Sequence, residues 1–231
     1  MMIKECIVLA GGLGTRLRSA VPDLPKCMAP VAGKPFLQHV VDYLSGQGIE
    51  HFIFSLGYMH DVIESFLKEH YPNLSYTVVL EECPMGTGGA ILLSAMQANG
   101  DDILIVNGDT LFAIDLESFS RFHVSHRADC TLALKPMTSF DRYGVVEIDK
   151  DHHILSFREK QFYEQGLING GVYALHIASL QTTGLTGKFS FEKDYLEAYY
   201  PSQRMMGMVQ DTYFIDIGIP EDFAKANKDF S

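Results

Sequence analysis

A glycine-rich segment near the N-terminus has the clearest chemical potential in this sequence, and it reads Leu9-Ala10-Gly11-Gly12-Leu13-Gly14-Thr15-Arg16-Leu17. Glycines let backbone N–H groups approach a phosphate chain without interference from a Cβ atom. Arg16 within the segment and Lys26 beyond it supply two cations that attract phosphate oxygens. The segment predicts a triphosphate site, and a tight turn that binds no ligand is the alternative.

Two common nucleotide motifs do not fit this segment. Leu17 stands where the dinucleotide fingerprint G-x-G-x-x-G would have its third glycine. No Gly-Lys-Ser or Gly-Lys-Thr follows, as a Walker loop would require. The sequence therefore argues against a dinucleotide-binding enzyme and against a P-loop nucleoside triphosphatase.

Two carboxylates occur at positions where they could bind a metal ion. Asp109, in Asn107-Gly108-Asp109, follows a buried apolar run, and an open α/β sheet binds its ligands at the carboxyl ends of its strands. There a carboxylate can hold Mg²⁺ against phosphate oxygens, although an Asx turn is the alternative. Asp216 lies in the apolar stretch 214–218. Because an unpartnered buried charge is costly, Asp216 should have a metal ion or a hydrogen-bonding partner.

The elements that must position these residues alternate along the first half of the chain. Short apolar runs at 6–9, 52–54, 76–80 and 103–106 are typical of parallel strands buried on both faces. Apolar residues at helical spacing predict helices over 35–47, 61–70 and 88–98. Strands that alternate with helices at this spacing predict βαβ units with right-handed crossovers.

The pattern changes after about residue 127. Short β candidates at 131–134, 144–148, 154–157 and 168–173 have little helix between them, and helices at 191–199 and 220–228 close the chain. The predicted fold class is a three-layer, Rossmann-like α/β fold with a mixed sheet. The second half is expected to add an inserted β-rich lobe that lies over the end of the first sheet.

Composition narrows the classes of partner. The chain has 231 residues, of which 47% are apolar and 20% charged, so it is an ordinary globular protein. A net charge of −11 argues against nucleic acid as a partner. Apolar runs are far shorter than the roughly 20 residues that span a bilayer, so no membrane partner is expected. The four cysteines are widely spaced, which indicates free thiols and a cytoplasmic location.

These motifs together resemble a known family, the sugar-1-phosphate nucleotidyltransferases. Its hallmark is L-A-G-G-x-G-T-R-L, then P-K, then P-V-x-G-K-P, and this chain has them at Leu9–Leu17, Pro25-Lys26 and Pro30–Pro35. The usual proline after the signature lysine is Cys27 here, a small departure. Further stretches, such as Phe140–Gly144, are similar to the guanylyltransferases of heptose 1-phosphate and of mannose 1-phosphate.

The resemblance implies one nucleotidyltransferase domain over residues 1–231, of the nucleotide-diphospho-sugar transferase fold. Residues 1–127 would form its nucleotide-binding half, and residues 128–231 would bind the sugar and complete the metal site. Such an enzyme makes an NDP-sugar and pyrophosphate from an NTP and a sugar 1-phosphate, with Mg²⁺ as cofactor. These small molecules are its expected partners, and the oligomeric state is left open, a homo-oligomer being compatible with the sequence.

The resemblance also implies a role for individual residues. Catalysis would involve Arg16, Lys26, Asp109 and Lys160, and Asp109 would share the metal ion with Asp216. The sugar would be bound by Gly144, Glu159, Lys160, Asn169 and Gly170. The nucleotide would be bound by Leu9, Ala10, Gly11, Gly12, Gly14, Thr15, Glu81, Gly86, Thr87 and Gly108.

Glu81 lies where relatives place the side chain that reads the base. A carboxylate only accepts hydrogen bonds. Guanine offers an N–H and an amino group side by side, whereas uracil offers a single N–H, so Glu81 favours GTP. Two alternatives stay open. One is an enzyme of the same fold that uses UTP or CTP, and the other is a non-catalytic, regulatory relative that binds an NDP-sugar.

Overall fold

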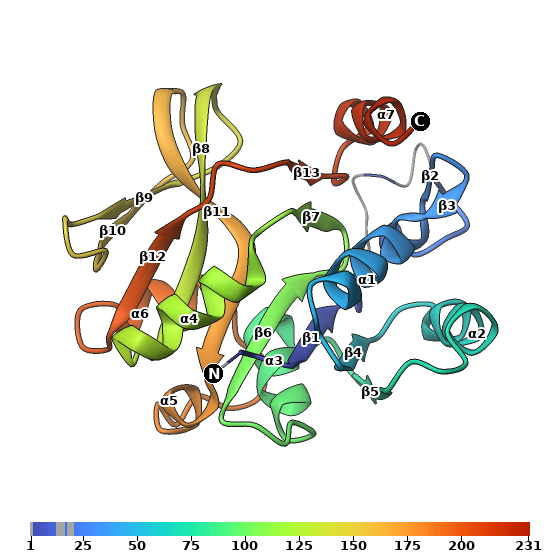
Figure 1. Ribbon diagram of the computed structural model, residues 1–231, viewed down its shortest axis with the longest axis horizontal. Helices are drawn as coiled ribbons and strands as arrows, with labels where there is room; N and C mark the ends of the chain where they lie inside the picture. The colour runs from blue at the N-terminus through green and yellow to red at the C-terminus, as the bar shows by residue number, and fades with distance from the viewer. Residues whose placement is uncertain (1, 13–16, 18–20) are drawn as a thin grey trace.

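The computed structural model describes residues 2–12, 17 and 21–231 (Figure 1). The expected ligands Gly14, Thr15 and Arg16 lie outside the described residues. Four parallel strands form the first part of a central sheet. Three of them are apolar runs buried on both faces, and the fourth, at the edge, is half-buried. In spatial order they are β5 (Tyr76–Leu80), β4 (His51–Leu56), β1 (Glu5–Leu9) and β6 (Asp102–Asn107).

The second half of the chain continues the same sheet. Beyond β6 come β11 (Tyr163–His176), antiparallel to β6, then β8 (Cys130–Phe140) and β12 (Met205–Val209). The hairpin of β9 (Val145–Ile148) and β10 (Ile154–Arg158) joins the N-terminal half of β11. The β-rich part is thus an extension of the first sheet and not a separate sheet lying over its end.

A bulge bends β11 at the point where the two parts meet. Asn169 lies opposite Leu134 and Tyr173 lies opposite Leu132, so β11 has two more residues than β8 in this interval. Gly171 has a φ of +71° there, a left-handed conformation that glycine adopts at low cost. The C-terminal half of β11 therefore pairs with β6, while its N-terminal half projects beyond the parallel strands (Figure 1).

Helices cover both faces of the sheet and make the expected three layers. Along β1, Cys6 and Val8 point into one apolar core and Ile7 into the other. The first core is covered by α1 (Phe36–Gly46), α2 (His60–His70), α4 (Leu116–His126) and α7 (Pro220–Asp229), and Figure 1 shows α1 and α4 across the near face. The second is covered by α3 (Gly86–Ala95), α5 (Ile177–Gln181), a π-helical turn (Phe191–Leu196) and α6 (Glu197–Tyr199).

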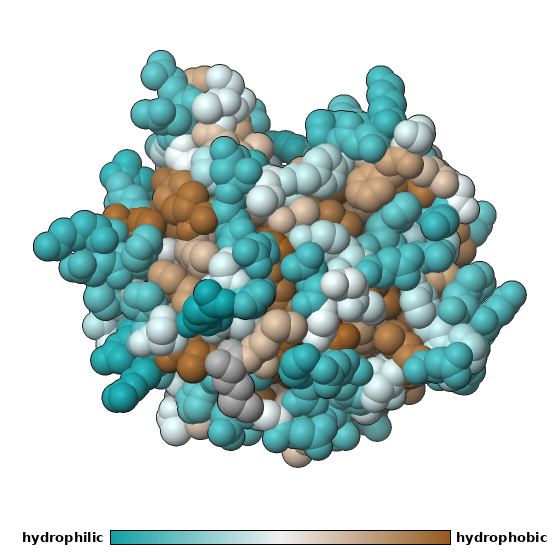
Figure 2. Space-filling model, viewed as in Figure 1, coloured by the Kyte–Doolittle hydropathy of each residue, from teal (hydrophilic) through white to brown (hydrophobic). Residues whose placement is uncertain are grey.

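Short elements complete the chain around the carboxyl ends of the parallel strands. A 3₁₀ turn (Lys26–Met28) precedes the two-residue strands β2 (Pro30–Val31) and β3 (Lys34–Pro35). Further along, β7 (Thr110–Phe112) pairs with β13 (Phe214–Asp216). None of the helices in the described part of the chain is long and apolar enough to cross a membrane. The face shown in Figure 2 is mostly hydrophilic, with apolar side chains visible between the polar ones.

The helix α4 and the strand β12 were not expected from the sequence. The buried side of α4 mixes Leu116 and Phe119 with Ser120 and His123, which obscures its apolar periodicity. Asp115 begins this helix by accepting a hydrogen bond from the Ser118 N–H. The short apolar run of β12 stands between polar segments, and Met205 and Met206 are buried where it pairs with β8.

Candidate active site

A cavity of about 680 Å³ opens at the carboxyl ends of the four parallel strands. The segments that follow β1, β4, β5 and β6 all contribute to its wall, as the open-sheet rule predicts. The cavity brings together most of the nucleotide and metal ligands expected from the sequence. These are Leu9, Ala10, Gly11, Gly12, Lys26, Glu81, Gly86, Thr87, Asp109 and Asp216.

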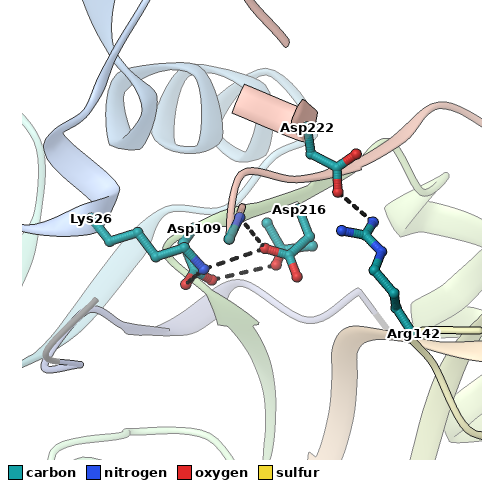
Figure 3. Close-up of polar contacts among 7 residues, drawn as sticks. Lys26, Asp109, Arg142, Asp216 and Asp222 are labelled. Carbon is teal, nitrogen blue, oxygen red and sulfur yellow. Dashed lines mark hydrogen bonds and ion pairs between the residues drawn. The ribbon is translucent and has the colours of Figure 1, made fainter. Parts of the chain in front are cut away.

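Lys26 joins the two carboxylates (Figure 3). Its Nζ lies 2.5 Å from Asp109 Oδ2 and 3.3 Å from Asp216 Oδ1, and only 12% of its side chain is exposed. Asp216 Oδ1 also accepts a hydrogen bond from the Gly218 N–H at 2.8 Å. A Cβ atom on Gly218 would lie 2.8 Å from both Asp216 Oδ1 and Lys26 Nζ, so a glycine is needed for this close approach.

The cluster fits a divalent cation. One ammonium against two carboxylates leaves one negative charge uncompensated, in side chains that are about 30% exposed to the cavity. Asp109 follows β6 and Asp216 ends β13, so two separate elements present carboxylate oxygens to the cavity. Carboxylate oxygens are the donors that Mg²⁺ prefers. Asp109 and Asp216 are therefore suited to hold such an ion against a phosphate chain.

Buried neighbours hold Lys26 in place. Its 3₁₀ turn is closed by a hydrogen bond from the Met28 N–H to the Pro25 carbonyl, and Cys27 and Met28 are buried. Burial, together with the negative charge of Asp109, raises the pKa of the Cys27 thiol to about 12. Cys27 is thus a neutral thiol in the cavity wall and a poor nucleophile, so the departure from proline at this position introduces no new chemistry.

Glu81 lines the cavity immediately after β5, with its carboxylate fixed by two donors. The Met85 N–H donates to Oε2 at 3.1 Å, and the Ser55 hydroxyl donates to Oε1 at 3.4 Å. A Cβ on Gly11 would lie 2.6 Å from Oε1, so Gly11 has to be a glycine for the carboxylate to sit beside the loop. Each oxygen keeps a lone pair for a ligand, because a carboxylate offers about four acceptor positions.

The start of α3 is held against the segment before the π-helical turn. Gly86, at a φ of +70°, lies where a Cβ would come within 2.5 Å of the Phe189 carbonyl oxygen. The Thr87 hydroxyl accepts a hydrogen bond from the Phe191 N–H at 2.9 Å. Both residues line the cavity, and both also fix its wall to the second half of the chain.

The other expected ligands lie outside this cavity. Gly108 does not line the cavity, and its N–H donates to the Leu9 carbonyl. Asn169 supports the bulge in β11, since its amide donates to the Tyr173 hydroxyl and accepts from the Gly171 N–H. Gly170 is buried against the Phe112 ring.

The remaining expected sugar ligands lie on the hairpin side of the molecule, also outside the cavity. Gly144 lies against the carbonyl oxygen of Arg158, where a Cβ would be only 2.3 Å away. Glu159 and Lys160 are exposed in the connection after β10. The structure thus gathers the two expected metal ligands and most of the expected nucleotide ligands in one cavity and leaves the expected sugar ligands outside it.

A family model described as nucleotidyl transferase matches residues 5–231. This chain belongs to the nucleotidyl transferase family. The family and the fold class expected from the sequence are both confirmed.

Individual relatives of this nucleotidyltransferase match along almost their whole length. It is 47% identical, over 97% of both chains, to a D-glycero-α-D-manno-heptose 1-phosphate guanylyltransferase from Aneurinibacillus thermoaerophilus. It is 42% identical to the enzyme of that name from Campylobacter jejuni, over 95% of this chain and 96% of the relative. The crystal structure of HddC from Yersinia pseudotuberculosis superposes with a TM-score of 0.89 at 37% identity, covering 99% of this chain and 100% of HddC. HddC has also been solved in complex with GMP-PN.

Sequence reasoning missed several residues of the nucleotidyltransferase cavity, of which Asn107 is the most informative. Asn107 ends β6 between Leu9 of β1 and the β11 bulge, and its side-chain amide faces Gly171. A polar residue at the end of an apolar strand was the available signal, but only Gly108 and Asp109 of that motif were assigned. Gly57, Tyr58 and Thr110 also line the cavity, without a comparable signal in the sequence.

Replacing Gly171 with alanine is expected to destabilise the nucleotidyltransferase and to lower its activity. Alanine at a φ of +71° costs about 1–2 kcal/mol, and its Cβ would lie 2.7 Å from Asn107 Nδ2. Gly184→Ala is the matched control, because Gly184 has a φ of +74° and no atom within 4 Å of its Cβ position. Urea unfolding should show a larger loss for Gly171→Ala, and turnover should fall only in that variant. Equal losses and equal turnover would show that Asn107 moves aside freely.

Proposed function

We propose that this nucleotidyltransferase converts GTP and D-glycero-α-D-manno-heptose 1-phosphate into a GDP-heptose and pyrophosphate. Mannose 1-phosphate is the second candidate sugar. The observation that carries the proposal is the cluster of Lys26, Asp109 and Asp216, in a cavity at the carboxyl ends of four parallel strands. The identities of 47% and 42% to enzymes named as heptose 1-phosphate guanylyltransferases support the choice of base and sugar.

In the proposed reaction, an oxygen of the sugar phosphate attacks the α-phosphorus of GTP in line. The new P–O bond forms as the bond from the α-phosphorus to the α,β-bridging oxygen breaks, and pyrophosphate leaves with that electron pair. No protein nucleophile is required, so the chain contributes position and charge. Lys26 would neutralise the triphosphate from inside the cavity, and the exposed Lys160 would neutralise the sugar phosphate.

Asp109 and Asp216 are the residues that would hold Mg²⁺. When bound, the ion neutralises phosphate charge and orients the triphosphate for attack. Arg16, in the glycine-rich segment, is proposed to neutralise the triphosphate together with Lys26 and Mg²⁺.

The surroundings of Glu81 support guanine as the base. Met85 and Ser55 fix its carboxylate beside Gly11, so a rigid pair of acceptors faces the cavity. Guanine presents two neighbouring donors that match a carboxylate, and charge-assisted hydrogen bonds are each worth about 1.5–3 kcal/mol. Glu81 would therefore select GTP over UTP by accepting from both donors.

Glu81→Gln is expected to lower the ratio of kcat/KM for GTP to that for UTP by about tenfold or more, since one decade is 1.4 kcal/mol. The Met85 N–H needs an acceptor, so the amide oxygen should take the place of Oε2 and the amino group that of Oε1. That amino group would then face the donors of guanine. Steady-state kinetics with both nucleotides measure the ratio.

The neighbouring Glu82→Gln is the control for this substitution, since Glu82 also lines the cavity, is exposed, and has no assigned role in base recognition. Its GTP/UTP ratio should match the wild type. If Glu81→Gln also kept the ratio, backbone groups near Gly11 and Gly86 would be the base-reading elements, and Glu81 would only support the loop.

A substrate panel tests the function as a whole. Pyrophosphate release is measured for GTP, UTP and CTP, each with the 1-phosphates of D-glycero-α-D-manno-heptose, mannose and glucose. The proposal expects the highest kcat/KM for GTP with the heptose or the mannose compound. A preference for UTP or CTP would reject the guanylyl assignment, and binding of an NDP-sugar without any pyrophosphate release would indicate a regulatory relative.

We also propose that the enzyme works in the cytoplasm. All four cysteines are free thiols, and three of them, Cys6, Cys27 and Cys130, are buried. Free thiols are typical of a reducing compartment.

A further inference from the structure

An ion pair on the side of Asp216 away from Lys26 connects two segments that are distant in the sequence (Figure 3). Arg142, in the connection between β8 and β9, places Nη2 2.5 Å from Oδ2 of Asp222 in the first turn of α7. The Asp222 side chain is only 21% exposed, and that of Arg142 is 41% exposed. The two residues are 80 positions apart in the sequence, so only the tertiary structure brings them together.

Asp222 belongs to the segment that carries Asp216. The chain passes from β13, which ends at Asp216, through Gly218 into α7. The Gly218 N–H bonds to Asp216, and the Ile217 N–H bonds to the Asp109 carbonyl. A displacement of the start of α7 would therefore also displace the carboxylate cluster, because a short, hydrogen-bonded segment connects the two.

Arg142 belongs to the loop on the sugar side. Its guanidinium lies 5.5 Å from the centroid of the Tyr143 ring, and that ring packs edge-on against Phe214 of β13 at 6.1 Å. The next residue, Gly144, lies against the carbonyl of Arg158, immediately before Glu159 and Lys160. The loop thus contacts the Asp216 segment on one side and the Glu159–Lys160 segment on the other.

We propose that the Arg142–Asp222 pair is a positioning latch that sets the distance between the sugar-phosphate ligands, Glu159 and Lys160, and the carboxylate cluster. The inference rests on the proposed function. In-line transfer needs the attacking oxygen within a few tenths of an ångström of its productive position, and a misplacement of about 1 Å can cost a hundredfold in rate. The cluster and the expected sugar ligands lie on different segments, and this pair connects those segments indirectly, through the 141–144 loop and the start of α7. Arg142 acts through Tyr143 and Gly144 and does not touch the substrate.

A double-mutant cycle tests the latch. Arg142→Ala, Asp222→Ala and the double variant are assayed with the NTP and sugar 1-phosphate that the substrate panel finds the wild type to use. Each single variant should raise KM for the sugar phosphate by about three- to tenfold, with KM for the nucleotide changed by less than about twofold. The double variant should be no worse than either single variant, because both remove one interaction. Arg142→Lys should recover part of the loss.

A second readout does not depend on turnover. Hydrogen exchange at the backbone amides of 141–144 and 159–163 should be faster in each single variant than in the wild type. In the double variant it should be no faster than in either single variant. Arg121→Ala is the control, since it removes an exposed ion pair with Glu117 on α4. It should change neither KM nor exchange in these segments.

Three results would overturn the latch. They are additive effects of the two substitutions, a rise in KM with Arg142→Ala alone, which would make Arg142 a direct substrate ligand, and unchanged exchange at 141–144 and 159–163. A wild type that turns over none of the panel substrates would reject the proposed function instead, and the exchange data would still decide whether the pair holds the loop.

Discussion

Replacing Asp109 with asparagine is expected to lower turnover by roughly a hundredfold or more in a protein that stays folded. Asparagine keeps the size of the side chain but removes the charge that would bind a divalent ion, and metal-dependent transfer loses several kcal/mol without it. The fold should persist, because Lys26 still has Asp216 as an ion-pair partner at 3.3 Å. Pyrophosphate release at saturating Mg²⁺ measures the loss, and thermal unfolding verifies the fold.

Asp216→Asn should behave in the same way, and the double variant should be little worse than either single variant. Both carboxylates are proposed to act on one ion, so their effects should not add. Asp211→Asn is the control, because this exposed carboxylate pairs with Lys135 and lies outside the cavity wall. Near-normal Mg²⁺-dependent turnover in folded Asp109→Asn would contradict the assignment of the cluster.

The second large effect is expected from the two lysines. Lys26→Ala should weaken binding of the triphosphate by at least about tenfold and leave the sugar phosphate largely unaffected, whereas Lys160→Ala should do the reverse. Lys26 lines the cavity beside both carboxylates, but Lys160 is exposed after β10 and forms no ion pair within the part of the chain that the structure describes. Isothermal calorimetry with a non-hydrolysable GTP analogue and with the sugar phosphate separates the two.

Stability gives a second distinction between the lysines. Lys26→Ala leaves two carboxylates facing each other without a cation, so it should also lower the free energy of unfolding. Lys160→Ala should not, and the exposed Lys150→Ala serves as its matched control. If both Lys26→Ala and Lys160→Ala weakened the same ligand equally, the separation of the two phosphate sites would be wrong.

The parallel strands illustrate how much the sequence determined. Runs such as 6–9 and 103–106 are apolar on both faces, and a strand covered by two helical layers satisfies that pattern. Once β1 and β6 are parallel neighbours, the glycine-rich segment and Asp109 have to meet at one edge. The prediction of a phosphate site there needed no tertiary information, since it rested on the glycines of 9–17 and on the cations Arg16 and Lys26.

In the β-rich half, the sequence did not determine the length and the pairing of the strands. The runs at 131–134 and 168–173 were predicted as short strands of an inserted lobe over the end of the first sheet, yet β8 and β11 are long and continue the main sheet. The bulge at Gly171 lets the single long strand β11 belong to both parts of the sheet, because one half of β11 pairs with β6 and the other does not. Apolar alternation predicts that a strand exists but not which neighbour it pairs with.

For the cluster of Lys26, Asp109 and Asp216, the sequence likewise predicted the residues but not their contacts. Sequence alone predicted Lys26 as a cation for a phosphate chain and Asp109 as a metal ligand. It predicted that Asp216 needs a partner, since a charge in an apolar setting is costly without one. The tertiary structure decided that they are partners of one another, across 190 positions for Lys26 and Asp216, through the pairing of β7 with β13. It likewise decided that Arg142 meets Asp222 and that Asn107 faces Gly171. Local patterns record which residues must be buried, whereas the choice among distant partners depends on how all the surfaces of the chain pack together.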